Sequence, residues 1–352
     1  MDRTERQKLC LKRWKEANGN GILELATGVG KTFTAFILIN SFVKQYPDFQ
    51  VVVSVPTSNL KDQWMEYVVK NGLLNNVFVY VINSLINMDM TCDLLVVDEI
   101  HLAASPQFIQ IFNKIKHRYM LGLTGSLVRS DDRHLLLTKY YPVVDTITVQ
   151  EATKNNWLSS YKEFLVLIDV DLSEYEDANR EFYEGFEFFG KNFEMAMKAR
   201  TDYKYRYALA KQMASSKSFD DIASMNKTII IKANKFGKGL QKRKDFIANH
   251  PKKIELANKI IASRQDQKVI VFCHTVKLAE KINAMTYSGK DSGKKGRIKL
   301  EEFVNLPFGA CASSRKLIAG FDCPDLSVLI DMDINSSKIR KVQSVGRIIR
   351  LN

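Results

Sequence analysis

Short apolar runs rich in β-branched residues alternate with stretches of helical periodicity through the first 150 residues of this 352-residue chain. Strands that alternate with helices form a parallel sheet whose two faces are both covered. The predicted strands are 21–25, 50–55, 77–82, 94–97 and 119–123, and the predicted helices are 33–42, 60–69 and 108–115. The alternation therefore predicts one α/β domain over residues 1–160.

The alternation breaks off after a further predicted strand at 161–170. The next stretch, 172–250, has helical periodicity and is rich first in aromatic and then in basic side chains. Strand and helix patterns then resume at 268–272, 276–284, 326–332 and 339–349, with a Gly/Lys/Ser loop at 287–297. We therefore predict a second α/β domain over residues 161–352, interrupted near its start by a helical, basic insertion at 172–250.

Composition disfavours several classes of protein. No apolar run reaches the ~18 residues of a membrane span, and the charged N-terminus lacks the apolar core of a signal peptide. The five cysteines are an odd number and include no C-x-x-C pair: Cys10, Cys92, Cys273, Cys311 and Cys323. A disulfide framework and a four-cysteine zinc site are therefore not expected, and the sequence favours a reducing, cytoplasmic setting.

Positive charge is concentrated in one stretch of the chain. The net charge is +13, and residues 198–244 hold thirteen lysines and arginines against three aspartates. Such a stretch favours a polyanionic partner, because each phosphate contact made by a basic side chain releases counterions. Within it, Arg243 and Lys244 are candidate phosphate contacts. The alternative is a solvated helical face without a ligand.

A glycine-rich turn joins the first predicted strand to the first predicted helix. Its sequence is Ala-Thr-Gly-Val-Gly-Lys-Thr, and its candidate phosphate-binding residues are Thr27, Gly28, Val29, Gly30, Lys31 and Thr32. Glycines let backbone N–H groups close around phosphates at a helix N-terminus. Lys31 can reach the β- and γ-phosphates and Thr32 can ligate Mg²⁺. This turn predicts ATP binding.

Two acids follow directly on the buried strand 94–97. Asp98 and Glu99 open the sequence Asp-Glu-Ile-His. Ligands of α/β sheets bind where parallel strands end, so these acids are expected beside the glycine turn. Asp98 is a candidate Mg²⁺ ligand and Glu99 a candidate residue to polarise the attacking water. His101 alone would more often be an ordinary core or surface histidine.

Further motifs follow in a fixed order. They are Gln7 with Trp14, Val-Pro-Thr at 55–57 with Gln63-Trp64, Leu-Thr-Gly-Ser at 123–126, Val-Ile-Val-Phe at 269–272, Gly-Phe-Asp at 320–322 with Pro324, and Gln-x-x-Gly-Arg-x-x-Arg at 343–350. With these motifs the chain resembles a superfamily-two DExH helicase. The branch is the one that contains type III restriction-enzyme helicase subunits, XPB-like translocases and phage UvsW-like branch-migration helicases.

The resemblance implies two RecA-like domains in tandem and a role for each motif. Gln7 would read adenine, and Gly320 and Asp322 would contact the nucleotide or its arginine network. Arg347 and Arg350 lie one helical turn apart and would complete the site when the second domain closes on the first. Four residues would couple hydrolysis to movement: His101, Thr124, Ser126 and Gln343.

Small polar residues near predicted element ends are candidate nucleic-acid contacts. They are Pro56, Thr57, Asn83, Ser84, Thr275 and Ser314. Such groups contact phosphates rather than bases, although each could equally be a helix cap or a turn residue. The aromatic residues Phe182, Phe186, Phe189 and Phe193 are spaced as one helix face. We expect them to pack the core of the insertion, with base stacking as the alternative.

Together these patterns predict an ATP- and Mg²⁺-dependent DNA helicase or translocase that remodels branched DNA. The alternatives are an RNA helicase and a non-unwinding, ATP-switched nucleic-acid clamp in a restriction or repair assembly. The chain departs from the family pattern at Gly125, where alanine is usual, and at Thr4, where arginine is usual. It also stops two residues after Arg350, where relatives continue with a strand and a helix, so we expect a short C-terminus.

Overall fold

A computed structural model describes residues 1–128, 131–288, 291, 293–314, 323 and 325–332. By its internal packing the chain divides into two compact units. The first comprises Met1–Phe164, Arg264–Phe272 and Ala284–Asn352. The second, called the helical unit below, comprises Leu165–Ser263 and Cys273–Asn283. The predicted domain boundary at residue 160 stays a prediction.

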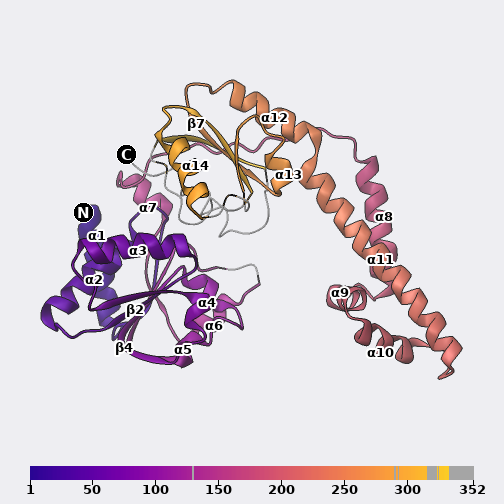
Figure 1. Ribbon diagram of the computed structural model, residues 1–352, viewed down its shortest axis with the longest axis horizontal. Helices are drawn as coiled ribbons and strands as arrows, with labels where there is room; N and C mark the ends of the chain where they lie inside the picture. Colours follow the sequence, from indigo (N-terminus) through magenta and orange to yellow (C-terminus); the bar gives the residue numbers. More distant parts are fainter. Residues whose placement is uncertain (129–130, 289–290, 292, 315–322, 324, 333–352) are drawn as a thin grey trace. The chain divides into compact units, whose positions relative to one another are not determined.

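A six-stranded sheet forms the core of the N-terminal part (Figure 1). Its strands are β1 (Asn20–Leu25), β2 (Val51–Val55), β3 (Val77–Val81), β4 (Met90–Asp98), β5 (Ile115–Thr124) and β6 (Val143–Ile147). They lie in the order β3-β2-β4-β5-β1-β6, and every neighbouring pair is parallel. All six carboxyl ends therefore meet at one edge of the sheet.

Alternate side chains of the strands fill two separate cores, one on each face. Leu23, Val53 and Val96 belong to the first core, whereas Val52 and Leu95 point to the second. The helices on the first face are α1 (Arg3–Glu16), α2 (Lys31–Gln45), α3 (Ser58–Lys70) and α7 (Val149–Lys154). The second face is covered by α4 (Ile82–Leu85), η1 (Ile100–Ala104), α5 (Ile111–Lys114) and α6 (His134–Thr138). Burial on both faces explains why the strands are apolar throughout.

A buried ion-pair network fixes α1 against the edge strand β6. The Arg6 guanidinium donates to both oxygens of Asp145, at 2.6 and 3.1 Å, and to Glu151 at 2.7 Å. Arg13 donates to Asp145 at 2.7 Å. Although burial opposes it, hydrogen bonding from Arg6 lowers the pKa of Asp145. The network therefore sets where α1 presents its other side chains.

A second, four-stranded sheet lies in the C-terminal part. Its strands are β7 (Lys268–Cys273), β8 (Met285–Tyr287), β9 (Gly309–Ser314) and β10 (Leu326–Asp331), in the order β10-β7-β9-β8. β10 is parallel to β7 and β8 is parallel to β9. The helix α14 (Gly293–Asn305) buries Phe303 in the core of this sheet. Two parallel sheets covered by helices confirm the predicted fold class.

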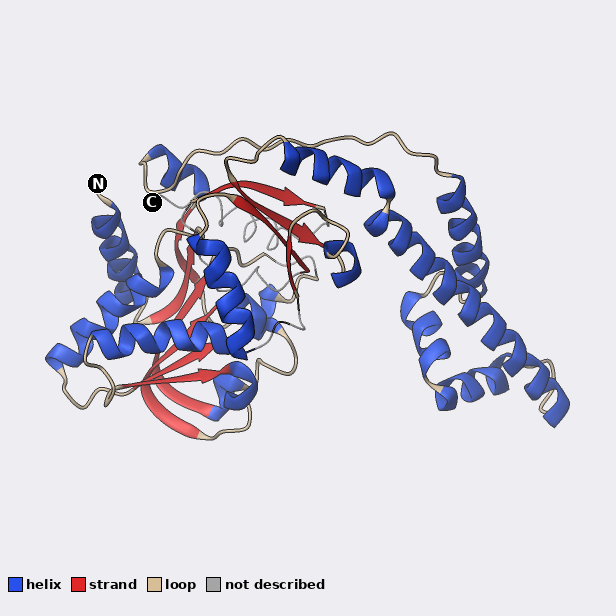
Figure 2. Ribbon diagram, turned by 45° about the horizontal axis from the view of Figure 1, so that its top comes forward, coloured by secondary structure: helices blue, strands red, loops and turns tan. Residues whose placement is uncertain are grey.

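The helical unit is built mainly from five helices (Figure 2). They are α8 (Ser173–Phe188), α9 (Phe193–Thr201), α10 (Tyr203–Met213), α11 (Phe219–Asn249) and α12 (Pro251–Ala262); the short α13 (Val276–Ala279) also belongs to this unit. At Gly185 and Gly239 the backbones of α8 and α11 touch. A Cβ on either residue would lie within 2.4 Å of a backbone atom of the other helix.

Several sequence predictions were wrong in detail. Residues 161–170 form no strand, and most of their apolar side chains are exposed. The predicted helix at 276–284 is only the four-residue α13, and the predicted loop at 287–297 contains the start of α14. The predicted helix at 108–115 shortens to α5. The predicted strands that are buried along their length are strands in the structure. The predictions failed at shorter segments, because tertiary packing rather than local sequence decided their secondary structure.

The aromatic run of the insertion packs a core, as predicted, but not from a single helix. Phe189 caps the end of α8, and Phe193 begins α9. Phe182, Phe186 and Phe193 nevertheless converge on Phe236 of α11, with ring centroids 5.1, 5.7 and 5.5 Å away. The regular spacing of these aromatic residues therefore reflects packing in one core, although the residues come from two helices and the turn between them.

Candidate functional site

The glycine turn lies at the carboxyl edge of the six-stranded sheet, between β1 and α2. Gly28 and Gly30 have φ angles of 93° and 94°, which are favourable only for glycine. Gly30 is also the N-cap of α2, so the free N–H groups of the first helical turn point out of this edge. The turn therefore has the backbone geometry of an anion-binding loop.

Lys31 begins α2 after β1, and Glu99 directly follows β4, yet their side chains meet although β5 lies between these two strands. The Lys31 ammonium lies 3.5 Å from Glu99 Oε1, and both side chains are largely buried. Glu99 has φ and ψ angles of 49°, a left-handed conformation that a residue with a side chain rarely adopts. Strain of this kind is held only where surrounding structure enforces it, and it turns the carboxylate toward Lys31.

Asp98 is buried at the end of β4 and receives two hydrogen bonds. The Trp64 indole N–H donates to Oδ2 at 3.0 Å, and the Glu99 backbone N–H donates to Oδ1 at 2.9 Å. Burial and the neighbouring Glu99 carboxylate raise the pKa of Asp98 to about 6, while Lys31 and Trp64 act in the opposite direction. Such an environment favours a cation close to this carboxylate.

A hydrogen-bonded chain joins the acidic motif to the loop after β5. His101 Nδ1 lies 3.0 Å from Thr124 Oγ1 and 3.4 Å from Glu99 Oε2. The Thr124 hydroxyl donates to the Ser126 carbonyl at 2.8 Å, so its single proton is already used. His101 Nδ1 must therefore carry a proton and donate it toward Thr124. The three predicted coupling residues that the structure describes are thus in direct contact.

The departure at Gly125 has a local steric cause. A Cβ at this position would lie 2.9 Å from Thr27 Oγ1 and 3.6 Å from Lys31 Nζ. The loop after β5 therefore runs directly against the glycine turn, and alanine would push Thr27 aside. Glu24 of β1 holds the same loop in place, because its Oε1 accepts the Leu127 backbone N–H at 2.9 Å.

Gln7 presents its amide to the glycine turn, and α1 supplies a second group beside it. Gln7 Nε2 donates to the Val29 carbonyl at 2.7 Å, and Arg3 Nε donates to the same oxygen at 3.1 Å. Arginine is expected at position 4, where Thr4 stands, but Arg3 reaches the turn from one residue earlier. The helix α1 therefore contacts the glycine turn through two side chains.

The candidate nucleic-acid residues of the first sheet follow β2 and β3, at the same edge. Pro56 and Thr57 follow β2, and Asn83 and Ser84 follow β3, both side chains of the latter pair being exposed. Thr57 is also the N-cap of α3, because its hydroxyl accepts the Leu60 backbone N–H at 3.3 Å. In the strand order, β3 and β2 lie on one side of β4, which ends in Asp98, and β1, which Lys31 follows, lies on the other side.

Thr275 and Ser314 follow or end two neighbouring strands of the second sheet, β7 and β9. Thr275 caps α13 and accepts the Leu278 backbone N–H at 3.1 Å. Five further predicted residues lie outside the described part of the chain: Gly320, Asp322, Gln343, Arg347 and Arg350.

Arg243 and Lys244 differ in their surroundings. The Arg243 guanidinium lies 4.4 Å from the Phe182 ring centroid, and its Nη2 donates to the Tyr175 hydroxyl at 3.4 Å. Lys244 is exposed. Arg243 therefore stabilises the α8–α11 contact through cation–π interaction, and Lys244 is the member of the pair whose side chain is open to solvent.

Sequence reasoning missed the roles of three side chains: Arg3, Glu24 and the indole N–H of Trp64. For Glu24 a signal was present, because a charged residue in an otherwise apolar strand next to the glycine turn needs a partner. Trp64 was named only as part of the motif that begins with Val-Pro-Thr at 55–57, but it is 1% exposed and its indole N–H donates to Asp98. Its contact depends on the pairing of α3 with β4, which sequence spacing does not give.

The edge fits a nucleoside triphosphate with Mg²⁺. Gln7 Oε1 and Thr27 Oγ1 are buried and have no hydrogen-bond partner among the residues that the structure describes. Unpaired buried polar atoms cost about 1–3 kcal/mol each, which a bound nucleotide would offset. The Thr32 hydroxyl and the Asp98 carboxylate are oxygen donors of the kind that Mg²⁺ prefers.

Two family patterns match the sequence, one at each end. Residues 1–84 match the family described as type III restriction enzyme, res subunit, and residues 252–352 match the helicase conserved C-terminal domain. The chain is also 24% identical to the DNA 3'-5' translocase XPB2 of Sulfurisphaera tokodaii, over 98% of this chain and 77% of that protein.

Solved structures share the fold. The helicase domain of Pyrococcus furiosus Hef has a TM-score of 0.52 and 16% identity, with 97% of this chain and 92% of that chain covered. The restriction-modification enzyme LlaBIII bound to DNA has a TM-score of 0.57 and 17% identity, with 99% of this chain but 26% of that chain covered. Across the described residues, no helix is both long and apolar enough to cross a bilayer.

Proposed function

From the premise that this chain belongs to the superfamily-two helicases and translocases, we propose that it hydrolyses ATP to move along DNA and remodels branched DNA. One observation carries the proposal. The phosphate turn, the acid pair and the loop after β5 form one bonded chain at a sheet edge, through Lys31–Glu99 and His101–Thr124. Such a chain can link a change at the γ-phosphate to a movement of the loop.

In the hydrolytic step, the backbone N–H groups of Gly28 and Gly30 and the Lys31 ammonium bind the phosphates. Thr32 and Asp98 would hold Mg²⁺, which supplies charge neutralisation on the β- and γ-phosphates. Glu99 orients the attacking water, because its strained backbone holds the carboxylate beside Lys31. Trp64 fixes the rotation of the Asp98 carboxylate by its indole N–H.

Coupling runs through His101. Its Nδ1 proton is within reach of both Glu99 Oε2 and Thr124 Oγ1. A shift of Glu99 therefore changes how strongly His101 donates this proton to Thr124. Thr124 in turn holds the Ser126 carbonyl and accepts the Ser126 N–H at 3.2 Å. The loop after β5 therefore responds to the state of the water-orienting carboxylate.

The second domain completes the site in this proposal. Arg347 and Arg350 would neutralise charge on the far side of the γ-phosphate when ATP and DNA favour closure. Arg347→Ala should keep ATP binding but lose DNA-stimulated turnover. A variant that keeps its DNA-stimulated rate would exclude Arg347 from completing the site.

DNA is favoured as the track by the XPB2 relative, which is named a DNA translocase, and by the LlaBIII structure, which is bound to DNA. Grip by Thr57, Asn83 and Ser84 would be nearly independent of sequence, because these groups contact phosphates.

The deciding experiment compares ATPase stimulation by linear duplex, forked DNA and RNA, together with unwinding of labelled forks. Remodelling predicts the strongest stimulation and strand separation on forks. Stimulation by RNA alone would indicate an RNA helicase, and stimulation without strand separation or displacement of bound protein would indicate an ATP-switched clamp.

Thr124→Val serves as the coupling test: it should keep basal ATPase and lose unwinding, whereas Thr138→Val, at the end of α6, should change neither.

A further inference from the structure

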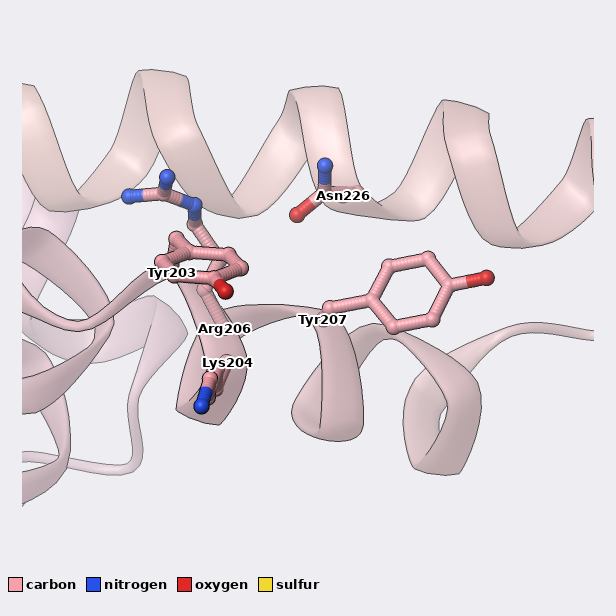
Figure 3. Close-up of a pocket in the computed structure, with 5 residues that line it drawn as sticks. All are labelled: Tyr203, Lys204, Arg206, Tyr207 and Asn226. Carbon is pink, nitrogen blue, oxygen red and sulfur yellow. The ribbon is translucent and has the colours of Figure 1, made fainter.

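An open cavity lies between α10 and α11 in the helical unit. Its volume is about 380 Å³, and it is lined by Tyr203, Lys204, Arg206, Tyr207 and Asn226. Figure 3 shows the two tyrosine rings at opposite ends of the group, with the Asn226 amide reaching down from α11 toward them. A volume of this size admits one planar aromatic ring system with its attached sugar.

The tyrosines are placed for contact with a ligand rather than for core packing. Tyr203 is 68% exposed and Tyr207 is 42% exposed, although both are large and largely apolar. The neighbouring Tyr205 instead packs against the core of the helical unit. The two outward rings therefore offer flat surfaces at a cavity wall, which is the requirement for stacking.

Asn226 adds a polar group with unused capacity. Its Oδ1 is buried and accepts no hydrogen bond from any residue in the described part of the chain. Arg206, by contrast, is held in place, since its Nη1 donates to the Ala199 carbonyl at 3.1 Å. The cavity thus combines two aromatic faces, one free amide acceptor and an anchored guanidinium.

The helix that lines most of the cavity carries basic residues and no acid, although Asp202 caps its N-terminus. α10 carries Lys204, Arg206 and Lys211 and has no acidic residue. The Lys211 ammonium lies 5.0 Å from the Tyr207 ring centroid, so charge continues along the helix from the cavity. A ligand with a flat ring and a neighbouring phosphate would match both features.

We propose that this cavity binds one unpaired nucleotide of a nucleic-acid strand. Its base stacks on Tyr203 and Tyr207 and donates to Asn226 Oδ1, and the adjoining phosphates lie on Lys204 and Lys211. The inference rests on the proposed function, and it assigns to the helical unit the task of holding a strand after its bases have come apart. Paired bases cannot enter, because their faces are covered by stacking in the duplex.

The test measures binding of an oligodeoxynucleotide that carries one 2-aminopurine, whose fluorescence falls on stacking. Tyr203→Ala with Tyr207→Ala should weaken single-strand binding on the order of 10-fold or more and abolish the fluorescence change. Tyr203→Phe with Tyr207→Phe should retain both, because the ring and not the hydroxyl stacks. The slope of log affinity against log salt should stay constant in the alanine variant and flatten by about 1 in Lys204→Gln.

Tyr140→Ala is the matched control. Tyr140 is 67% exposed and has Lys139 5.8 Å from its ring centroid, but it lines no part of this cavity. The proposal is overturned if the double alanine variant binds single strands as Tyr140→Ala does, or if blunt duplex binding falls equally. Failure of the proposed function looks different: the wild-type protein would then hydrolyse no ATP in response to DNA.

Discussion

At the carboxyl edge of the six-stranded sheet, Lys31, Asp98 and Glu99 are largely buried and each contacts another polar side chain. In the helical unit, most basic side chains of α10 and α11 stand at the surface, and Lys235 of α11 pairs with an exposed acid, Glu184. The first region positions a few charges in a fixed geometry at a cost in stability. The second keeps many charges hydrated and available to a long polyanion.

This difference teaches which substitutions each region tolerates. Bond-making chemistry needs groups fixed within tenths of an ångström, so one lost contact at the sheet edge has a large effect. Phosphate binding by a surface sums many weak contacts, so one lost charge has a small effect. The predictions below test this contrast from the largest expected effect to the smallest.

Lys31→Ala should lower ATP turnover by roughly 10²–10³-fold or more, because the ammonium stabilises charge on the transferred phosphoryl group. DNA binding should persist, since Lys31 lies away from Thr57 and Ser84. Lys44→Ala, an exposed lysine at the other end of the same helix α2, is the control and should behave as wild type. Steady-state ATPase and fluorescence anisotropy make the measurement, and normal turnover in Lys31→Ala would refute the assignment.

Asp98→Asn should abolish ATPase and remove the ~1–3 kcal/mol of stability that the metal-free protein loses when Asp98 ionises between pH 4 and pH 7, although the amide group also replaces one of the two accepting oxygens. The pKa of Asp98 is raised to about 6 in the folded protein, so this carboxyl ionises less readily there than in the unfolded chain. At pH 7 the carboxyl is ionised, and its ionisation lowers the stability of the folded protein. For a raised carboxyl pKa, the favourable contribution is present below the unfolded value and is lost as the pH rises through about 6. Urea unfolding at pH 4 and pH 7 should therefore show a smaller loss of stability between the two pH values in Asp98→Asn than in the wild type.

Trp64→Phe should lower turnover by about 10-fold, because the Asp98 carboxylate loses the donor that fixes its rotation. Trp14→Phe is the matched control, since its indole N–H donates at 2.9 Å to the Met120 carbonyl and it is equally buried. Both variants should lose a similar ~1–2 kcal/mol of stability. Equal turnover in the two would show that the indole acts on the fold and not on the site.

Lys244→Glu should weaken DNA binding by only a few-fold and flatten the salt slope by about 1 or 2, because it removes one phosphate contact and adds one repulsion. Lys154→Glu, an exposed lysine at the end of α7, is the charge-matched control. Arg243 is unsuitable for this test, because its guanidinium packs on Phe182 and its loss would also destabilise the helical unit. A slope identical in the two variants would leave Lys244 as a solvated side chain.

The sequence predicted the fold class and the contact between the glycine turn and the acid pair, because both follow local rules, but it missed the strands β6, β8 and β9. The glycine turn needs positive φ at Gly28 and Gly30, and parallel strands must end at one edge, so Lys31 and Glu99 were bound to meet. Prediction failed where a contact depends on packing between distant elements. Trp64 with Asp98 and Arg243 with Phe182 are such contacts, and the spacing of residues along one helix cannot reveal them.

The glycine contacts between α8 and α11 have a mechanical consequence. Because the two backbones touch at Gly185 and Gly239, and Lys235 pairs with Glu184 beside them, the helices cannot slide past one another without opening backbone contacts. Two rods bonded along their length bend far less than the same rods side by side. A force applied to a strand that is held near α10 would therefore be transmitted along the 31-residue α11 with little bending of the two helices.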